Sequence, residues 1–367
     1  MLELDGNCQE GGGALLRVAL AASTLTNKPF KITNIRAGRP KPGLKAQHIN
    51  TIKALQEMSG AKSSEAELGT TELWFQPGQV KSGNYTIDIG TAGSITLLLQ
   101  GLILPCLFAP AKVTLNITGG TCGKWQASVD YLKELLLPQL KRFVNKIDLR
   151  ILKRGYFPRG GGEIVLEITP KYKLKDFNHV RELVDKLSSE TKKIELVDQG
   201  DLEQIRGVLN LSQELEQYNV PERVTHTAKM LVSPKQVPIN IRTELVNTFS
   251  TGGDLLLWSV HSKEDDVSNI NPVRLAGDSL LEKGKKSEIV AKEAAAKLLK
   301  ELDSGAAVDS YLADQLLQFM LLLPESKIET SEVTKHCLTN IYVLEKFFSV
   351  KFNVNNNVIS VEKVIVE

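Results

Sequence analysis

Cysteine is scarce in this sequence, and the few cysteines show no pairing pattern. The four, Cys8, Cys106, Cys122 and Cys337, lie far apart, without the short spacings of a zinc site or the density of a disulfide framework. Such free cysteines are typical of a reducing compartment. We therefore expect a cytoplasmic protein that needs neither disulfides nor structural zinc.

Long apolar runs are also missing. The most apolar stretch, residues 95–109, is interrupted by Gln100 and Pro105 and is too short to span a bilayer. The first five residues include acids and form no apolar signal region. We expect no membrane partner, and nothing in the sequence indicates an obligate protein partner.

The net charge is small. At +2 it is too close to neutral to indicate a nucleic-acid partner by itself. The hydrophobic fraction of 42% and the charged fraction of 24% are ordinary for a globular protein. A chain of 367 residues is long enough for two domains with a sizeable core. Any basic binding surface must therefore be local.

The order of the predicted elements repeats along the chain. Apolar spacing predicts strand, helix, strand, helix and hairpin at residues 2–4, 14–25, 30–35, 46–55, 64–68 and 71–75. The same order returns at residues 85–89, 94–104, 112–117, 129–143 and 149–168. A third pass begins at 193–197, breaks off, and resumes at 311–323, 327–330, 336–348 and 350–364.

This order predicts an α/β (α+β) fold. We expect three related β-α-β-α-β-β units packed about a common axis, with a smaller inserted α/β domain. The expected domains are residues 1–199 and 305–367 for the main domain, interrupted by the insert at 200–304. The insert has predicted strands at 205–211, 239–246 and 254–260, and predicted helices at 222–231 and 287–302.

Each unit has a helix start marked by glycine, at residues 11–13, 90–93 and 304–305. Units packed about one axis would bring these helix N-termini toward one centre, where free N–H groups favour bound phosphate. Each glycine cluster alone is equally typical of a tight turn or a helix cap.

Acidic residues are absent from 11–56, although this window is rich in lysine and arginine. Arg36 and Arg39 flank a glycine at a strand end, which suits bidentate contacts to phosphate. Gln47 and His48 follow in the first turns of a helix. The pattern favours a cationic surface for phosphates, and the alternative is a locally basic, solvated face.

Glu10 is the acid that directly precedes this window. A carboxylate facing a phosphate site is suited to holding Mg²⁺ or Mn²⁺ on a nucleotide. As a capping acid at the start of a helix it would be unremarkable.

These residues together resemble the RNA 3′-terminal phosphate cyclase family. The matching stretches run in order through nearly the whole chain. They are Asp5-Gly6, residues 10–13, 35–44, Gln47-His48, 90–94, Gln100, 155–158, 160–162, 311–315, His336 and 338–340.

The resemblance implies ATP-dependent conversion of an RNA 3′-phosphate end into a 2′,3′-cyclic phosphodiester, with Mg²⁺ or Mn²⁺ and a covalent histidine-AMP intermediate. It implies His336 as the nucleophile and Glu10 as the metal-binding acid. The implied nucleotide pocket is Gln100, Tyr311, Leu312, Ala313, Asp314 and Gln315. The implied contacts to substrate phosphate are Arg17, Arg36, Arg39, Gln47 and His48.

Two of these residues are ambiguous on their own. A lone histidine at the start of an apolar helix, such as His336, is more typical of a core or capping residue than of a catalyst. Tyr311 is as typical of core packing as of stacking on adenine.

One segment departs from the family. After Gly119-Gly120-Thr121 the family usually has an acid and a proline-rich turn that helps to form the adenine pocket. Here residues 122–128 read Cys-Gly-Lys-Trp-Gln-Ala-Ser, and Trp125 offers a replacement stacking surface.

Two alternatives remain open. A non-catalytic relative acting in ribosome or RNA assembly would keep the fold and lose the nucleophile, which His336 and Glu10 argue against. An enolpyruvyl transferase would share the repeat architecture and would have no use for His336 or residues 311–315.

Overall fold

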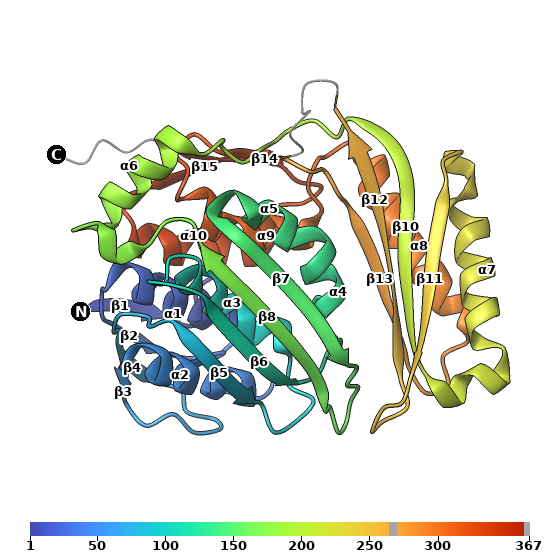
Figure 1. Ribbon diagram of the computed structural model, residues 1–367, viewed down its shortest axis with the longest axis horizontal. Helices are drawn as coiled ribbons and strands as arrows, with labels where there is room; N and C mark the ends of the chain where they lie inside the picture. Colours follow the sequence, from blue (N-terminus) through green and yellow to red (C-terminus); the bar gives the residue numbers. More distant parts are fainter. Residues whose placement is uncertain (264–269, 363–367) are drawn as a thin grey trace.

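The computed structural model of the protein describes residues 1–263 and 270–362 (Figure 1). Within these ranges the strands form four sheets of four strands each. Three sheets and their helices form one body, and the fourth sheet lies beside it with two helices of its own (Figure 1). No helix among the described residues has both the length and the apolar character needed to cross a membrane.

The first unit contains the first sheet. Its elements are β1 (Leu2–Asp5), α1 (Ala14–Thr26), β2 (Phe30–Thr33), α2 (Ala46–Ser59), β3 (Lys62–Ser63) and β4 (Leu73–Gln76). β1 pairs parallel with β2, with Leu2 opposite Phe30. β4 pairs antiparallel with both β2 and β3, so the strand order is β1-β2-β4-β3.

The second and third units repeat this topology. The second contains β5 (Gly83–Asp88), α3 (Ile95–Cys106), β6 (Val113–Gly119), a helical run of α4 (Val129–Tyr131), η1 (Leu132–Leu136), α5 (Leu137–Leu140) and η2 (Lys141–Phe143), then β7 (Val144–Lys153) and β8 (Gly162–Pro170). The third contains β9 (Glu195–Leu196), α9 (Ser310–Met320), β14 (Lys327–Glu329), α10 (Lys335–Phe347), β15 (Lys351–Asn355) and β16 (Val358–Glu362). Their orders, β5-β6-β8-β7 and β9-β14-β16-β15, match the first sheet strand for strand. The prediction of three related units is confirmed.

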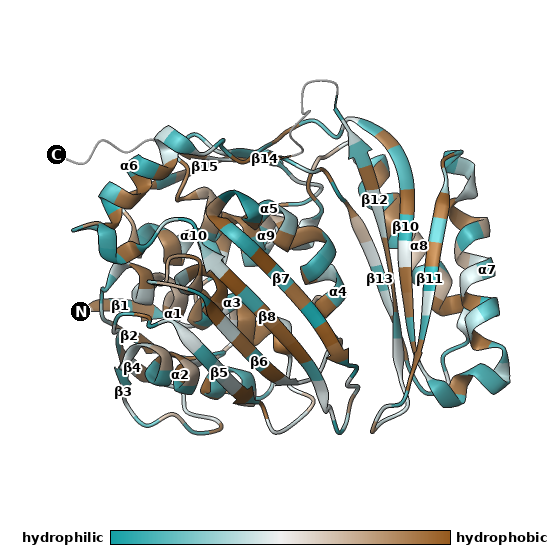
Figure 2. Ribbon diagram, viewed as in Figure 1, coloured by the Kyte–Doolittle hydropathy of each residue, from teal (hydrophilic) through white to brown (hydrophobic). Residues whose placement is uncertain are grey.

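The helices of the three units pack in a cyclic pattern. The second helix of each unit lies against the first helix of the next, with α2 on α3, η1 on α9, and α10 on α1. Every residue of α1 from Ala14 to Leu25 is buried, and α3 is apolar along most of its length (Figure 2). A helix that is apolar on all sides belongs in a core. The common axis therefore runs through a helical core shared by all three units.

The fourth sheet interrupts the third unit. Its elements are β10 (Asp201–Ser212), α7 (Val220–Val232), β11 (Ile239–Val246), β12 (Gly253–Ser262), β13 (Ala276–Leu281) and α8 (Ser287–Asp303), in strand order β11-β10-β12-β13. One face forms a hydrophobic cluster of its own with α7 and α8. Val208, Leu256 and Trp258 belong instead to the large core of the three units. The charged connector before this sheet forms η3 (Leu174–Asp176) and α6 (Val180–Glu190).

The amphipathic helix predicted over 129–143 is continuous but irregular. Its middle turn, η1, is a π-helix, and Pro138 follows it at the start of α5. Proline has no N–H to donate to the carbonyl four residues earlier, which is that of Glu134. The Arg274 Nη1 donates to this carbonyl at 2.5 Å. Arg274, two residues before β13, thereby satisfies a backbone group that the proline leaves free.

Three local predictions were wrong. Residues 64–68 form no strand, since Leu68 is 71% exposed and a turn closed by Thr70 follows, so the apparent alternation has no buried face. β13 was missed in the fourth sheet. Gly305 does not mark the start of a helix, because it follows the C-terminus of α8 with φ of 74°, a left-handed conformation typical of helix ends.

Candidate functional site

His336 and Glu10 meet where the third unit packs on the first. α10 begins at Lys335 because the Thr334 hydroxyl accepts the Cys337 N–H at 3.2 Å, so His336 lies in the first turn. Its Nδ1 is 3.4 Å from the Glu10 Oε2. The backbone N–H of Glu10 donates to the Thr339 Oγ1 at 3.2 Å, which ties the two segments together.

Thr339 was not among the predicted site residues. Two signals in the sequence could have found it: it lies in the family-matching stretch 338–340, and it follows His336 by three residues, a spacing that shares a helix face.

His336 is a neutral imidazole near neutral pH. Burial, together with the positive charges of Arg17 and Arg39, lowers its pKa to about 4. The side chain keeps 42% of its surface exposed. A neutral, accessible ring nitrogen is what a nucleophilic histidine requires.

Glu10 has one paired and one unpaired carboxylate oxygen. The Arg39 Nη2 donates to Oε1, while Oε2 is buried and makes no hydrogen bond to a described residue. A Cβ at Gly12 would collide with this carboxylate, so the glycine makes room for it. No group of three or more His, Cys, Asp or Glu within residues 1–263 and 270–362 has the geometry of a metal site. A cation at Glu10 would therefore need ligands from a substrate, which is the usual way that Mg²⁺ meets a nucleotide.

Arg17 and His48 direct two donors into one space. The Lys45 N–H donates to the His48 Nδ1 at 3.1 Å, so the ring proton is on Nε2. That Nε2 lies 3.5 Å from the Arg17 Nη1, which also only donates. A Cβ added to Gly13 would lie 2.6 Å from the His48 Nε2 and 2.8 Å from the Arg17 Nη1.

These two donors and Gly13 define an anion seat at the start of α1. Gly13 is the N-cap of that helix and has no side chain that could cap its N–H groups. Burial lowers the pKa of His48 well below its usual range, with Arg17 adding to the effect, so the ring is neutral. Burial also lowers the pKa of Arg17, to about 10, which leaves it charged at neutral pH. The seat is suited to phosphate.

Gln100 belongs to this group through Arg17. Its Oε1 accepts from the Arg17 Nε at 2.7 Å, an interaction that orients the guanidinium. Gln100 thus contacts the phosphate side of the site.

Arg36 and Gln47 lie nearby in different settings. The Arg36 Nη1 donates to the carbonyls of Lys41 and Gly43 at 2.7 and 3.0 Å, so it braces this loop. Only its remaining N–H groups are left for a substrate. Gln47 lies on α2 beside His48, and its Oε1 is 3.8 Å from the position of a Cβ at Gly93.

Residues 311–315 form the start of α9, with side chains in contrasting environments. Tyr311 is 47% exposed and has an edge contact with Tyr131, at 6.4 Å between ring centroids. Leu312 and Ala313 are buried in the main core, so a contact of either residue to a nucleotide would have to come from its backbone. Asp314 has its pKa raised to about 7, chiefly by burial and against the opposing effect of Arg17.

Asp309 caps this helix and was not predicted as part of the site. Its Oδ1 accepts from the N–H groups of Tyr311 and Leu312 at 3.1 and 2.8 Å, and from the Tyr131 hydroxyl at 2.6 Å. The side-chain cap satisfies the helix N-terminus, so α9 offers no open anion site there. An aspartate two residues before Tyr311 could have been predicted from the sequence as a helix N-cap.

The segment that departs from the family divides into a buried and an exposed part. Cys122 is buried, whereas Trp125 is 87% exposed and has φ of 60°. Lys124 pairs with Glu282 at the end of β13, at 2.7 Å. The Trp125 ring makes no ring contact with another aromatic residue in the described part of the chain.

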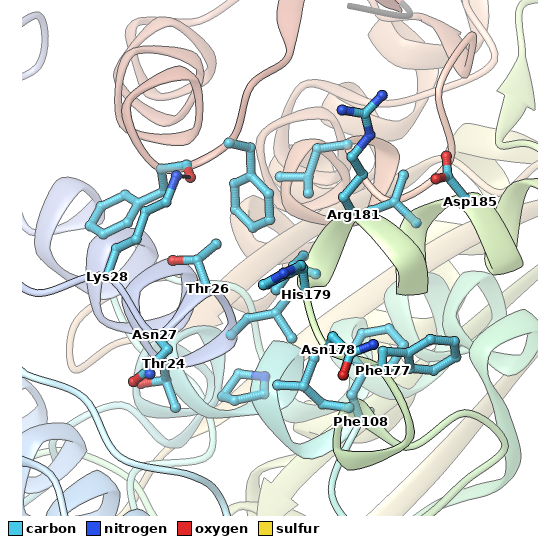
Figure 3. Close-up of a pocket in the computed structure, with 18 of the residues that line it drawn as sticks. Thr24, Thr26, Asn27, Lys28, Phe108, Phe177, Asn178, His179, Arg181 and Asp185 are labelled. Carbon is cyan, nitrogen blue, oxygen red and sulfur yellow. Dashed lines mark hydrogen bonds between the residues drawn. The ribbon is translucent and has the colours of Figure 1, made fainter. Parts of the chain in front are cut away.

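A large cavity lies away from these residues. It measures about 1170 Å³ and lies near the C-terminal ends of α1, α3 and α10, beside α6. Figure 3 shows Lys28, His179 and Arg181 among the side chains around it. The Lys28 Nζ donates to the Phe347 carbonyl at 2.7 Å, where α10 ends. None of the predicted site residues lines this cavity, and the candidate site is at the opposite, N-terminal ends of α1 and α10.

Comparison with known proteins gives one consistent result. The sequence model of RNA 3′-terminal phosphate cyclase matches residues 8–354. An RNA 3′-terminal phosphate cyclase of Archaeoglobus fulgidus is 39% identical over 362 residues, covering 98% of this chain and 100% of the relative. That of Methanosarcina mazei is 39% identical over 358 residues, covering 96% and 97%. That of Pyrococcus furiosus is 37% identical over 358 residues, covering 98% and 96%. This chain therefore belongs to the RNA 3′-terminal phosphate cyclase family.

Proposed function

We propose that this enzyme uses ATP to convert an RNA 3′-phosphate end into a 2′,3′-cyclic phosphodiester, by way of AMP bound covalently to His336. The observation that carries the proposal is the neutral His336 placed against Glu10, with Arg17 and Arg39 close enough to lower its pKa. One nucleophile among cationic groups is the set that nucleotidyl transfer requires.

In the first step the His336 Nε2 attacks the α-phosphorus of ATP. The bond from that phosphorus to the bridging oxygen breaks, and pyrophosphate leaves with the electron pair. The ring proton stays on Nδ1, the nitrogen that faces Glu10. The carboxylate therefore lies where the ring gains positive charge, and it stabilises the phosphoramidate as it forms.

The next two steps use the RNA end. An oxygen of the 3′-phosphate attacks the AMP phosphorus, and the P–N bond breaks to return the lone pair to Nε2. The 2′-hydroxyl then attacks the 3′-phosphorus, loses its proton, and expels AMP. A phosphate monoester oxygen is a poor leaving group, and this route replaces it with AMP. We assign the terminal phosphate to the anion seat of Arg17, His48 and Gly13, with Arg39 at its exposed side.

Glu10 would hold Mg²⁺ or Mn²⁺ together with the phosphates of ATP. The Oε2 has more than one lone pair, so it can face the Nδ1 proton and still bind a cation. Such a cation neutralises phosphate charge. We place the adenine near Tyr311, whose exposed ring is suited to stacking, with Asp314 and Gln315 on the same helix. We also infer a cytoplasmic location, which agrees with four free cysteines.

The test is incubation with ATP labelled at the α-phosphate and a divalent cation. We expect acid-labile, alkali-stable label on the wild-type protein and none on His336→Ala, which should keep the fold and lose RNA cyclisation. The fold of the variant is checked by circular dichroism. Undiminished labelling of His336→Ala would move the nucleophile elsewhere. The next candidate by residue type is His48, although it is only 1% exposed.

The non-catalytic alternative makes the opposite prediction. A protein acting only in RNA assembly would bind RNA without label appearing on His336. The same labelling experiment therefore decides between the two.

A further inference from the structure

Two phenylalanines are exposed at neighbouring turns. Phe157 is 81% exposed in the hairpin tip between β7 and β8, residues 156–161, and Phe249 is 68% exposed in the β11–β12 turn, residues 247–252. Large aromatic side chains that are exposed to solvent on neighbouring segments are typical of a binding site.

The hairpin tip and the β11–β12 turn are fixed to each other. The Phe249 ring lies directly against Gly161, where any side chain would collide with it. The Arg159 N–H donates to the Ser250 Oγ at 3.2 Å. A Cβ at Gly252 would lie 2.8 Å from the Tyr156 ring. The backbone thus holds both phenylalanines on one rigid support.

This support continues to the anion seat. A Cβ at Gly160 would lie 2.6 Å from the Thr91 carbonyl oxygen, so the hairpin tip packs on the loop before α3. In the same loop, a Cβ at Gly93 would lie 3.8 Å from the Oε1 of Gln47, which directly precedes His48 on α2. The 90–93 loop therefore connects the α2 residues beside the seat to the hairpin tip that carries Phe157.

The charge beside Phe157 suits a phosphodiester backbone. Arg159 is exposed in the same hairpin tip as Phe157, and among the described residues its guanidinium has no ion-pair partner. One acid contacts the β11–β12 turn: Glu214 accepts from the Thr251 hydroxyl.

We propose that Phe157 and Phe249 form a stacking platform for the bases of single-stranded RNA upstream of the 3′ end, with Arg159 contacting the backbone. Aromatic rings bind single strands without regard to sequence because every base has a π-face. The proposal rests on the proposed function, since it takes the terminal phosphate to lie in the anion seat. Paired bases are already stacked on each other, so a duplex cannot use the platform.

The test compares a long and a short substrate. Wild-type enzyme, Phe157→Ala and Phe249→Ala are assayed for cyclisation of a 3′-phosphorylated decamer and a 3′-phosphorylated dinucleotide, and for labelling of His336. We expect KM for the decamer to rise about five- to a hundredfold in each variant, the usual cost of losing one base–aromatic stack. The dinucleotide ends before the platform, so its KM and the labelling should not change.

Matched variants separate stacking from structure. Phe157→Trp keeps a stacking ring and should restore decamer binding, while Trp74→Ala removes an aromatic residue that is 39% exposed on β4, in the first unit, and should change nothing. An equal rise in KM for decamer and dinucleotide, or none for either, would overturn the proposal.

Direct binding keeps this test independent of catalysis. Fluorescence anisotropy with a labelled 3′-hydroxyl decamer should show the same loss of affinity in both alanine variants, and weak binding of the corresponding duplex. If the wild-type protein binds this decamer through the phenylalanines but accepts no AMP, the proposed function is refuted and the stacking platform is supported. Unchanged anisotropy in both variants would refute the platform alone.

Discussion

Arg39 gives the sharpest test of how the cationic residues divide their work. Its Nη2 donates to Glu10, and its side chain is 40% exposed. A guanidinium has five N–H donors, and the others of Arg39 have no partner in the described part of the chain. Arg36, in contrast, donates to two backbone carbonyls of its own loop. We therefore expect Arg39, rather than Arg36, to turn toward the terminal phosphate of the RNA.

The size of the effect follows from this exposure. A charge-assisted hydrogen bond contributes roughly 1.5–3 kcal/mol when it is shielded from water. At 40% exposure solvent screening reduces this contribution, so we take the lower end, about 1.5 kcal/mol, which is a factor of slightly more than ten. Arg39→Ala should slow AMP transfer from adenylylated enzyme to 3′-phosphorylated RNA at least tenfold, and should slow His336 labelling by less.

The assay isolates the two half-reactions. Adenylylated protein is prepared, freed of ATP, and mixed with 3′-phosphorylated or 3′-hydroxyl RNA, and loss of label is followed in time. Binding of the 3′-hydroxyl RNA should barely change, because the phosphate that Arg39 contacts is missing. Arg36→Ala serves as the matched control and should lower the melting temperature through its loop. Abolished labelling with normal transfer would refute the reasoning and assign Arg39 to the phosphates of ATP.

Three further predictions concern the metal, the insert and a buried acid. Glu10→Ala should impair adenylylation by weakening metal use, with partial rescue by extra Mn²⁺, and an unchanged dependence on metal concentration would contradict this. Replacing 200–304 with a short Gly/Ser linker tests the predicted domain boundaries. We expect a folded core that still accepts AMP but has a lower melting temperature, because Trp258 is removed from the main core. Loss of cooperative unfolding would show that the boundaries are wrong. Burial raises the pKa of Asp254 from 3.8 to about 7. Between these two values the folded state binds a proton that the unfolded state has released. The free energy of unfolding should therefore rise as pH falls from about 7 to 4. Asp254→Asn should raise stability at pH 8 and flatten this dependence in denaturant titrations, and an unchanged pH profile would be the contrary result.

The sequence predicted the fold better than it predicted the contacts. The order of helices and strands depends on the local spacing of apolar residues, so the three units could be predicted from the sequence. The fully buried positions of Leu312 and Ala313 could also have been inferred, because Leu316 and Leu317 continue the same face of α9. The use of Arg36 as a loop brace could not, because it depends on a left-handed residue with φ of 58° whose side chain turns back on residues 41–43. The pairing of Arg39 with Glu10 likewise joins two loops whose approach no local pattern encodes.

The closure of the helical ring between α10 and α1 has a consequence for synthesis of the chain. Glu10 is made early, and its partners His336 and Thr339 are made more than three hundred residues later. During translation the first two units are complete while the face of α1 that receives α10 is still uncovered. A nascent chain therefore cannot bring His336 and Thr339 against Glu10 until α10 has left the ribosome, and it exposes apolar helix surface until then. The contact between Glu10 and His336 therefore forms only when α10 packs on α1 and the three units are complete.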